Sequence, residues 1–350
     1  MSTDVLHRVF DGQGFDGTPL EIDLAALHVP YGASGLTAVE PAIREAAERH
    51  ERIGLSGPIG CGKTSVLRYA LDQPDQDVAP IWVSVARDSD DVVLEPKPFV
   101  AHVIQHTLRA AEKSSALDRA TAAEVLQAAT ARRPLPTTAR RAAGKVAAKF
   151  WIANAELSSD VTTTLYGQDL TRPLGEVVES AGRALEAIAA FGYDPVIVID
   201  DSDAFTRGGT DAEQARLVAA FFGRTLKALT ELPCGLVVAL HSDYEALPGY
   251  QAARREWGVL QRVLEVPETV SGHLQRILAR RIELTAGARL DDVLLAEAVE
   301  ALAELNRGPA RRNLRTVLAV AHEALAGAVD RDREIIDAGD VRRAATKHLP

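Results

Sequence analysis

The alternation of apolar and polar positions follows no steady period over residues 1–36, so we expect this segment to be an extended arm. Apolar side chains then recur at helical spacing between residues 36 and 52, which predicts a helix. The next residues, 52–56, form a short apolar run typical of a buried strand, and residues 64–71 show the pattern of a second helix.

Four further apolar runs predict strands with the same buried character. The run from Val196 to Ile199 consists of β-branched residues only, so neither of its faces suits water, and this indicates a central strand covered on both sides. The predicted strands after residue 56 are 79–86, 195–200, 235–240 and 262–267.

Helical periodicity fills most of the chain between and after these strands. Proline residues punctuate it, and 156–167 is compatible with a hairpin or a loop. The predicted helices are 99–111, 114–130, 137–153, 174–191, 211–229, 251–258, 271–286, 291–305, 309–326 and 340–348.

This order of elements predicts an α/β protein. We expect a five-stranded parallel sheet between helices, an αβα core, followed by a small all-helical lid. The expected domains are the arm at 1–36, the core at 37–267 with a helical insertion at about 97–192, and the lid at 268–350.

Composition narrows the class of protein. The 350 residues are 47% hydrophobic and 25% charged, which is ordinary for a globular chain. The longest apolar runs are far shorter than a membrane span, and no secretory signal is visible at the N-terminus, so we expect a soluble protein of the cytoplasm with no membrane partner. Cys61 and Cys234 are the only cysteines, which argues against a disulfide framework.

The net charge of −10 hides one basic region. If residues 137–153 are helical, Arg141, Lys145 and Lys149 form one stripe with Arg140 beside it. Three interpretations remain open at this point: a solvated helix face, a contact to nucleic-acid phosphates, or a contact to an acidic protein.

The strongest chemical signal lies between the strand at 52–56 and the helix that follows it. The residues match the pattern G-x-x-x-x-G-K-[ST] of a nucleotide phosphate loop in the strand–loop–helix setting that the motif requires. Backbone amides and the helix N-terminus would bind phosphate oxygens, Lys63 would reach the outer phosphates, and the Thr64 hydroxyl would bind Mg²⁺. The loop comprises Gly57, Pro58, Ile59, Gly60, Cys61, Gly62, Lys63, Thr64 and Ser65.

Two carboxylates directly follow the central strand. Ligands of a parallel α/β sheet bind at the carboxyl ends of its strands, so Asp200 and Asp201 should emerge at the same edge as the phosphate loop. This is the Walker B arrangement, in which Asp200 would hold Mg²⁺ and Asp201 would orient and deprotonate an attacking water.

Earlier in the chain, Tyr31 suits either plain packing or the covering of an adenine.

In the order of these motifs the chain resembles the AAA+ ATPases and the related STAND and KAP branches, on the origin-recognition-like side, over residues 35–348. The resemblance rests on the phosphate loop, on the run Asp200 to Asp203, and on Gly308 to Leu314. It implies a sensor 1 residue at His241 or Ser242, a sensor 2 arginine at Arg311, and an arginine finger at Arg262 that completes the site of a neighbouring subunit.

The resemblance therefore implies an ATPase that uses ATP and Mg²⁺ and assembles as a homo-oligomer. We expect a nucleotide-driven switch or motor, with DNA as one candidate substrate and an unidentified partner protein. The alternative is a nucleotide-gated protein-interaction module of the STAND type, whose hydrolysis is slow or incidental.

Overall fold

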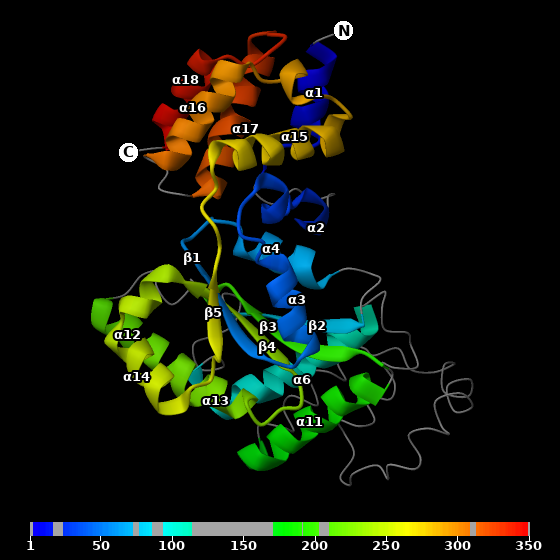
Figure 1. The fold of residues 1–350 in the computed structure, drawn as a ribbon, viewed down its shortest axis with the longest axis vertical. Coiled ribbons are helices and arrows are strands. Elements are labelled where there is room, and N and C mark those ends of the chain that lie inside the picture. Colours follow the sequence, from blue (N-terminus) through cyan, green and yellow to red (C-terminus); the bar gives the residue numbers. More distant parts are fainter. Residues whose placement is uncertain are drawn as a thin grey trace, which may run out of the picture. The chain divides into compact units, whose positions relative to one another are not determined.

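The computed structural model describes residues 3–16, 24–72, 77–85, 94–113, 171–190, 192–202, 210–308 and 313–348 (Figure 1). The chain divides into two compact units: a first unit of Met1–Ala42, Gly57–Asp72 and Glu265–Pro350, and a second unit of Ile43–Ser56 and Gln73–Leu264. The helices expected at 114–130 and 137–153, the undecided segment 156–167 and the basic stripe all lie outside the described residues.

The second unit contains a five-stranded parallel sheet, as predicted. Its order is β2-β3-β4-β1-β5, so β4 lies between the strand that leads into the phosphate loop and the strand that ends in the two carboxylates. In the register of β2 and β3, Ser84 stands opposite Asp200. The strands are β1 Arg52–Gly57, β2 Val78–Ser84, β3 Asp194–Asp200, β4 Gly235–His241 and β5 Arg262–Glu265.

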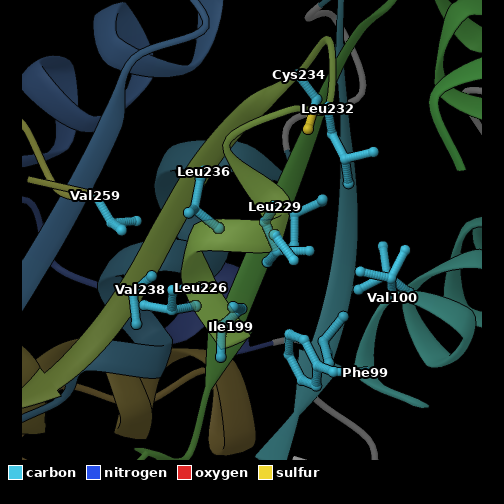
Figure 2. Close-up of a cluster of buried hydrophobic side chains, with 14 of the residues drawn as sticks. Phe99, Val100, Ile199, Leu226, Leu229, Leu232, Cys234, Leu236, Val238 and Val259 are labelled. Atoms are coloured by element: carbon cyan, nitrogen blue, oxygen red, sulfur yellow. The ribbon is translucent and has the colours of Figure 1, made fainter. Parts of the chain in front are cut away.

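Helices cover one face of the sheet with a large apolar cluster, part of which Figure 2 shows. Alternate strand residues such as Ile197, Ile199 and Leu236 point into this cluster because successive side chains of a strand face opposite sides. The covering helices include α6 Pro96–Lys113, α11 Leu174–Ala190, α13 Leu226–Leu229 and α14 Pro248–Trp257.

The opposite face of the central strand is covered too. Val196 and Val198 are fully buried there. Gly235 lies so close to Val196 and to α3 Glu40–Glu48 that an added Cβ would stand 3.2 Å from Val196 Cγ2 and 3.4 Å from the Ala47 carbonyl oxygen. The prediction of a strand buried on both sides is confirmed.

The helix predicted at 211–229 is interrupted by a π-helical turn. It consists of α12 Asp211–Ala220, the π segment Phe221–Thr225 and α13. Thr210 and Glu213 cap its start reciprocally. The π turn carries Phe222, whose ring contacts Tyr244 at 5.6 Å and Tyr250 at 5.0 Å between centroids.

The first unit has a helical core of its own, which includes the N-terminus. Four helices form the lid region: α15 Ser271–Ala286, α16 Ala296–Arg307, α17 Leu314–Asp330 and α18 Ala338–His348. Residues 290–292 form a short 3-10 helix instead of the expected start of α16, and Asp292 accepts a hydrogen bond from the Arg289 backbone amide there.

The expected extended arm is wrong for residues 3–11, which form helix α1 Thr3–Asp11. Leu6 and Val9 are fully buried in the same apolar cluster as the lid helices. Arg8 Nη1 donates to the Ala286 carbonyl oxygen at 3.0 Å. The apolar period of α1 is less than three turns long, so the pattern alone was too short to reveal the helix.

The remaining described helices of the first unit are short. They are α2 Leu24–Leu27, the 3-10 helix Tyr31–Ser34 and α4 Lys63–Leu71, which follows the phosphate loop as predicted. No helix among the described residues combines the length and the apolar character that a membrane span requires.

Candidate functional site

The phosphate loop joins β1 to α4 through two left-handed glycines. Gly60 has φ +75° and Gly62 has φ +101°, conformations that side chains other than glycine rarely adopt. Lys63, which is 7% exposed, folds back over the loop, and its Nζ donates to the carbonyl oxygens of Gly57 at 2.9 Å and Pro58 at 3.0 Å. The ammonium is thus held at the N-terminal end of α4, where a helix favours anions.

Cys61 fills the space beside Gly57. The Cys61 side chain is 6% exposed, and a Cβ added at Gly57 would lie 2.6 Å from its Sγ and 3.3 Å from Val266 Cβ. A side chain at position 57 would therefore displace Cys61. The motif glycine is required here by packing as well as by backbone approach to a ligand.

The N-terminus of α17 contacts the phosphate loop at Gly60. The Arg315 backbone amide donates to the Gly60 carbonyl oxygen at 3.2 Å. Asn313 caps α17 by accepting from the Thr316 amide at 3.1 Å, and the same Oδ1 would stand only 2.0 Å from a Cβ at Gly60. The loop and the start of α17 are therefore packed without room for a methyl group.

Sequence reasoning placed the lid contact at Arg311, which lies outside the described residues. It missed Asn313 and Arg315. A signal for Asn313 was present, because asparagine before an apolar helical run is a common N-cap. Nothing in the pattern indicated that the capped end would meet Gly60.

In the second unit, the two carboxylates at the end of β3 differ in their surroundings. Asp200 is 7% exposed, and its Oδ1 accepts from the Asp201 backbone amide at 2.8 Å. Asp201 has a left-handed backbone with φ +60°, and its Oδ2 accepts from Ser84 Oγ at 2.6 Å. Asp201, the predicted base, thus accepts a hydrogen bond from a hydroxyl at the end of the neighbouring strand β2.

A buried network supports the residue after the carboxylates. Ser202, which is 1% exposed, donates through its hydroxyl to the Ala239 carbonyl oxygen of β4. The Tyr244 hydroxyl donates to the Ser202 carbonyl oxygen. These bonds join the end of β3 to β4 and to the turn that follows it. Sequence reasoning singled out neither Ser84, Ser202 nor Tyr244.

Of the two candidates at the end of β4, His241 is buried and Ser242 is exposed. His241 Nδ1 accepts from the Asp243 backbone amide at 3.2 Å, so its ring proton stands on Nε2 in the neutral form. The Ser242 hydroxyl lies 3.5 Å from Asp243 Oδ1. The choice between His241 and Ser242 as sensor 1 stays a prediction, with His241 the more firmly held.

Arg262 begins β5, the edge strand of the sheet. Its Nη2 forms an ion pair with Glu51 Oε2 at 3.0 Å, and 40% of its side chain is exposed. An arginine acting on a neighbouring subunit from this position would have to leave Glu51.

Tyr31 packs inside the first unit. It is 3% exposed, and its ring stacks on His273 with 4.6 Å between centroids. Its backbone amide donates to Glu40 Oε1 at 2.8 Å, and His28 Nε2 lies 2.8 Å from the same oxygen. This arrangement agrees with the packing role predicted for Tyr31. The role of covering an adenine stays a prediction.

Burial controls the charge states in this cluster. It lowers the pKa of His273 from 6.5 to about 4, and the neighbouring His28 lowers it further. Burial alone would raise the pKa of Glu40, but the hydrogen bonds from His28 and Tyr31 lower it overall. A neutral His273 therefore stacks beside an ionised Glu40 near neutral pH.

The chemistry of Thr64 and Asp200 fits Mg²⁺. A hydroxyl and a carboxylate are hard oxygen donors, and nucleotide-bound Mg²⁺ uses one or two protein ligands beside phosphates and waters. Within the part of the chain that the structure describes, no group of three or more His, Cys, Asp or Glu could hold a metal ion.

No protein-family model matches the chain, and no curated protein matches it. Among solved structures, the Aeropyrum pernix ORC2 protein in its ADP form has a TM-score of 0.50 at 12% identity, over 96% of this chain and 72% of that chain. The Aeropyrum pernix ORC1 protein in complex with DNA has a TM-score of 0.49 at 17% identity, over 91% of this chain and 66% of that chain. Cdc6p from Pyrobaculum aerophilum has a TM-score of 0.48 at 14% identity, over 94% and 72%.

At these identities the likeness to ORC2 shows the fold alone. That fold is an α/β core with a five-stranded parallel sheet, followed by a helical lid. The fold implied by the resemblance to the origin-recognition side of the AAA+ ATPases is confirmed.

Proposed function

We propose that this protein binds ATP with Mg²⁺ on the phosphate loop, hydrolyses it, and uses the bound nucleotide to set the position of the lid helix α17. One observation carries the proposal. The loop that would hold the phosphates is also where α17 begins, through the bond from the Arg315 amide to the Gly60 carbonyl and the close packing of Asn313. A phosphate that reshapes the loop would act on α17 directly.

Phosphate binding would rearrange Lys63. Its ammonium leaves the carbonyl oxygens of Gly57 and Pro58 and pairs with the outer phosphates, while loop amides and the N-terminus of α4 donate to phosphate oxygens. This exchange replaces two neutral acceptors by a charged one. Pro58, Ile59 and Ser65 shape the loop around the same phosphates.

Hydrolysis would depend on the carboxylates. When bound, Mg²⁺ would neutralise phosphate charge, and Thr64 and Asp200 are the residues that would hold it. Asp201 orients the attacking water and takes its proton. The Ser84 hydroxyl competes for Asp201 Oδ2, so Asp201 works as a base most readily when this bond opens.

Three further residues would act on the γ-phosphate. His241 or Ser242 would approach it as sensor 1, Arg311 would report it to the lid, and Arg262 would leave Glu51 to serve a neighbouring subunit. The finger role makes the active form a homo-oligomer.

DNA is one candidate for what the ATPase acts on, through Arg140, Arg141, Lys145 and Lys149. The second candidate function is a nucleotide-gated interaction module with slow hydrolysis and an unidentified protein partner. The 2.6 Å hydrogen bond from Ser84 to Asp201 favours this second function. A carboxylate that must first give up a hydrogen bond is slower to accept the proton of a water, so hydrolysis would be slow.

The two candidates differ in their response to DNA. We would measure the ATP hydrolysis rate and the oligomeric state with no nucleic acid, with single-stranded DNA and with double-stranded DNA. Stimulation or assembly that disappears in the variant Lys145→Ala with Lys149→Ala supports action on DNA. A low rate that none of these additions changes supports the interaction module, and absence of ATP binding contradicts both.

A further inference from the structure

A pair of histidines on helix α6 has no part in the proposed function. His102 and His106 are one helical turn apart, and their Nε2 atoms face each other at 2.9 Å. Their ring centroids are 4.4 Å apart, with the planes inclined by 65°. Both side chains are half-buried.

The helix that carries the pair is firmly packed. Phe99 and Val103, on the adjoining face of α6, are fully buried in the apolar cluster of the second unit, and Figure 2 shows Phe99 in that cluster. The i, i+4 spacing on a fixed helix holds both rings on one stripe, because such residues are neighbours on a helix surface. The helix keeps the two rings on one stripe, and the hydrogen bond between their Nε2 atoms sets the 2.9 Å separation.

This separation matches the bite of a metal chelate. Imidazole nitrogens bind divalent transition metals at ~2.0–2.1 Å, and two such ligands at ~90° to each other lie ~2.9 Å apart. A tetrahedral ion would need a separation of ~3.4 Å at the same bond lengths. The hydrogen-bonded rings already hold their nitrogens close to these separations, so small ring rotations bring both onto one ion.

We infer that His102 and His106 form a two-histidine site for a divalent transition-metal ion of the copper(II) or nickel(II) class. In the metal-free protein, one Nε2–H donates to the other Nε2. When the ion binds, both Nε2 lone pairs go to the metal, and the proton of the donating ring moves to its own Nδ1, so no net proton is released. The other coordination positions belong to water or to a further ligand.

Two protein nitrogens, one from each histidine, define the site. Affinity should follow the usual order for nitrogen ligands, with copper(II) bound most tightly. The same order places zinc(II) below copper(II) at this site.

The test uses the full chain without a polyhistidine tag, stripped with EDTA and titrated with CuCl₂, NiCl₂ or ZnCl₂ against a competing chelator. We expect each of His102→Gln and His106→Gln to weaken the tightest copper site by at least ~10-fold, because either change turns a two-nitrogen site into a one-nitrogen site. His7→Gln, which removes an exposed histidine of α1, is the matched control and should change nothing.

A second measurement needs no variant. Copper(II) bound at one equivalent should give an electron paramagnetic resonance spectrum of a tetragonal ion with two coupled imidazole nitrogens. The inference is overturned by equal copper affinity in the wild type and both α6 variants, by a spectrum without two imidazole nitrogens, or by zinc binding more tightly than copper.

Discussion

The phosphate loop of the first unit and the carboxylate edge of the second unit are built by different means. In the loop, backbone atoms set the geometry: Gly60 and Gly62 have left-handed conformations, and the contacts of Lys63 are to carbonyl oxygens a few residues away. At the carboxylate edge, side chains distant in sequence set the geometry, as when Ser84 donates to Asp201 across 117 positions.

Because the two regions are built differently, we expect that nucleotide binding and ATP hydrolysis can be changed separately by mutation. Changes in the loop affect the atoms that would hold phosphates, whereas changes at the carboxylate edge affect the base and its restraint. Variants of the two regions should therefore fall into two classes, one defective in nucleotide affinity and one altered only in rate.

The largest effect is expected from Lys63→Ala. The change removes the ammonium that would pair with the outer phosphates, so nucleotide affinity should fall by about 100-fold or more, since charge-assisted bonds to phosphate are the strong ones. Titration of a fluorescent ATP analogue measures it. Lys97→Ala, a lysine change on α6, is the control. Unchanged nucleotide affinity in Lys63→Ala would show that the phosphate loop is not the nucleotide-binding site.

Asp201→Asn should leave ATP affinity nearly unchanged and lower the hydrolysis rate by about 100-fold, because an amide cannot take the proton of the attacking water. Steady-state turnover at saturating ATP measures this effect. Asp291→Asn, the same chemical change at an exposed position of the first unit, should behave as wild type. Full turnover in Asp201→Asn would show that another group is the base.

Ser84→Ala tests the restraint on that base. Without the 2.6 Å bond from the hydroxyl, Asp201 is free to face a water, and turnover should rise about 3- to 10-fold while ATP affinity stays constant. Ser271→Ala is the control. A fall in turnover would instead mean that Ser84 holds Asp201 in its working orientation.

The smallest effect concerns pH. The pKa of His273 is lowered to about 4 in the folded protein, so between pH 6.5 and 4 the unfolded chain binds the proton more readily, and stability is lost as pH falls through that window. Glu40, whose pKa is also lowered, adds to this loss mainly below pH 4.5.

His273→Phe keeps a ring against Tyr31 but does not titrate. Its melting temperature should therefore fall by several degrees less than that of the wild type between pH 7 and 5, with His28, Glu40 and Arg276 as the remaining titratable neighbours. Thermal melts at both pH values measure the difference, and His7→Gln is the control. Parallel losses in His273→Phe and the wild type would contradict a burial penalty at this histidine.

The sequence predicted what depends on local spacing. The five strands, α4, α6, α11 and the C-terminal helices follow from hydrophobic periodicity, and the loop follows from glycines and a lysine at fixed intervals. It did not predict α1, because two and a half turns of apolar periodicity are too weak a signal without the lid helices that bury Leu6 and Val9.

Contacts between residues distant in sequence could not be predicted from hydrophobic periodicity or motif spacing. The bond from Ser84 to Asp201 depends on the register of β2 with β3, and the contact of Asn313 with Gly60 depends on where α17 begins. Strand register and helix packing depend on the whole fold. The local sequence around Ser84 or Asn313 therefore does not indicate these contacts. Such contacts appear only when the sheet and the lid are assembled.

The central claim is that nucleotide on the phosphate loop acts on the start of α17. Hydrogen exchange of the Arg315 and Thr316 amides, which bond to Gly60 and Asn313, measures it most directly when recorded with and without saturating ATP and Mg²⁺. We predict that ATP changes the exchange of these amides in the wild type and not in Lys63→Ala. Identical exchange with and without bound ATP in the wild type would contradict the account.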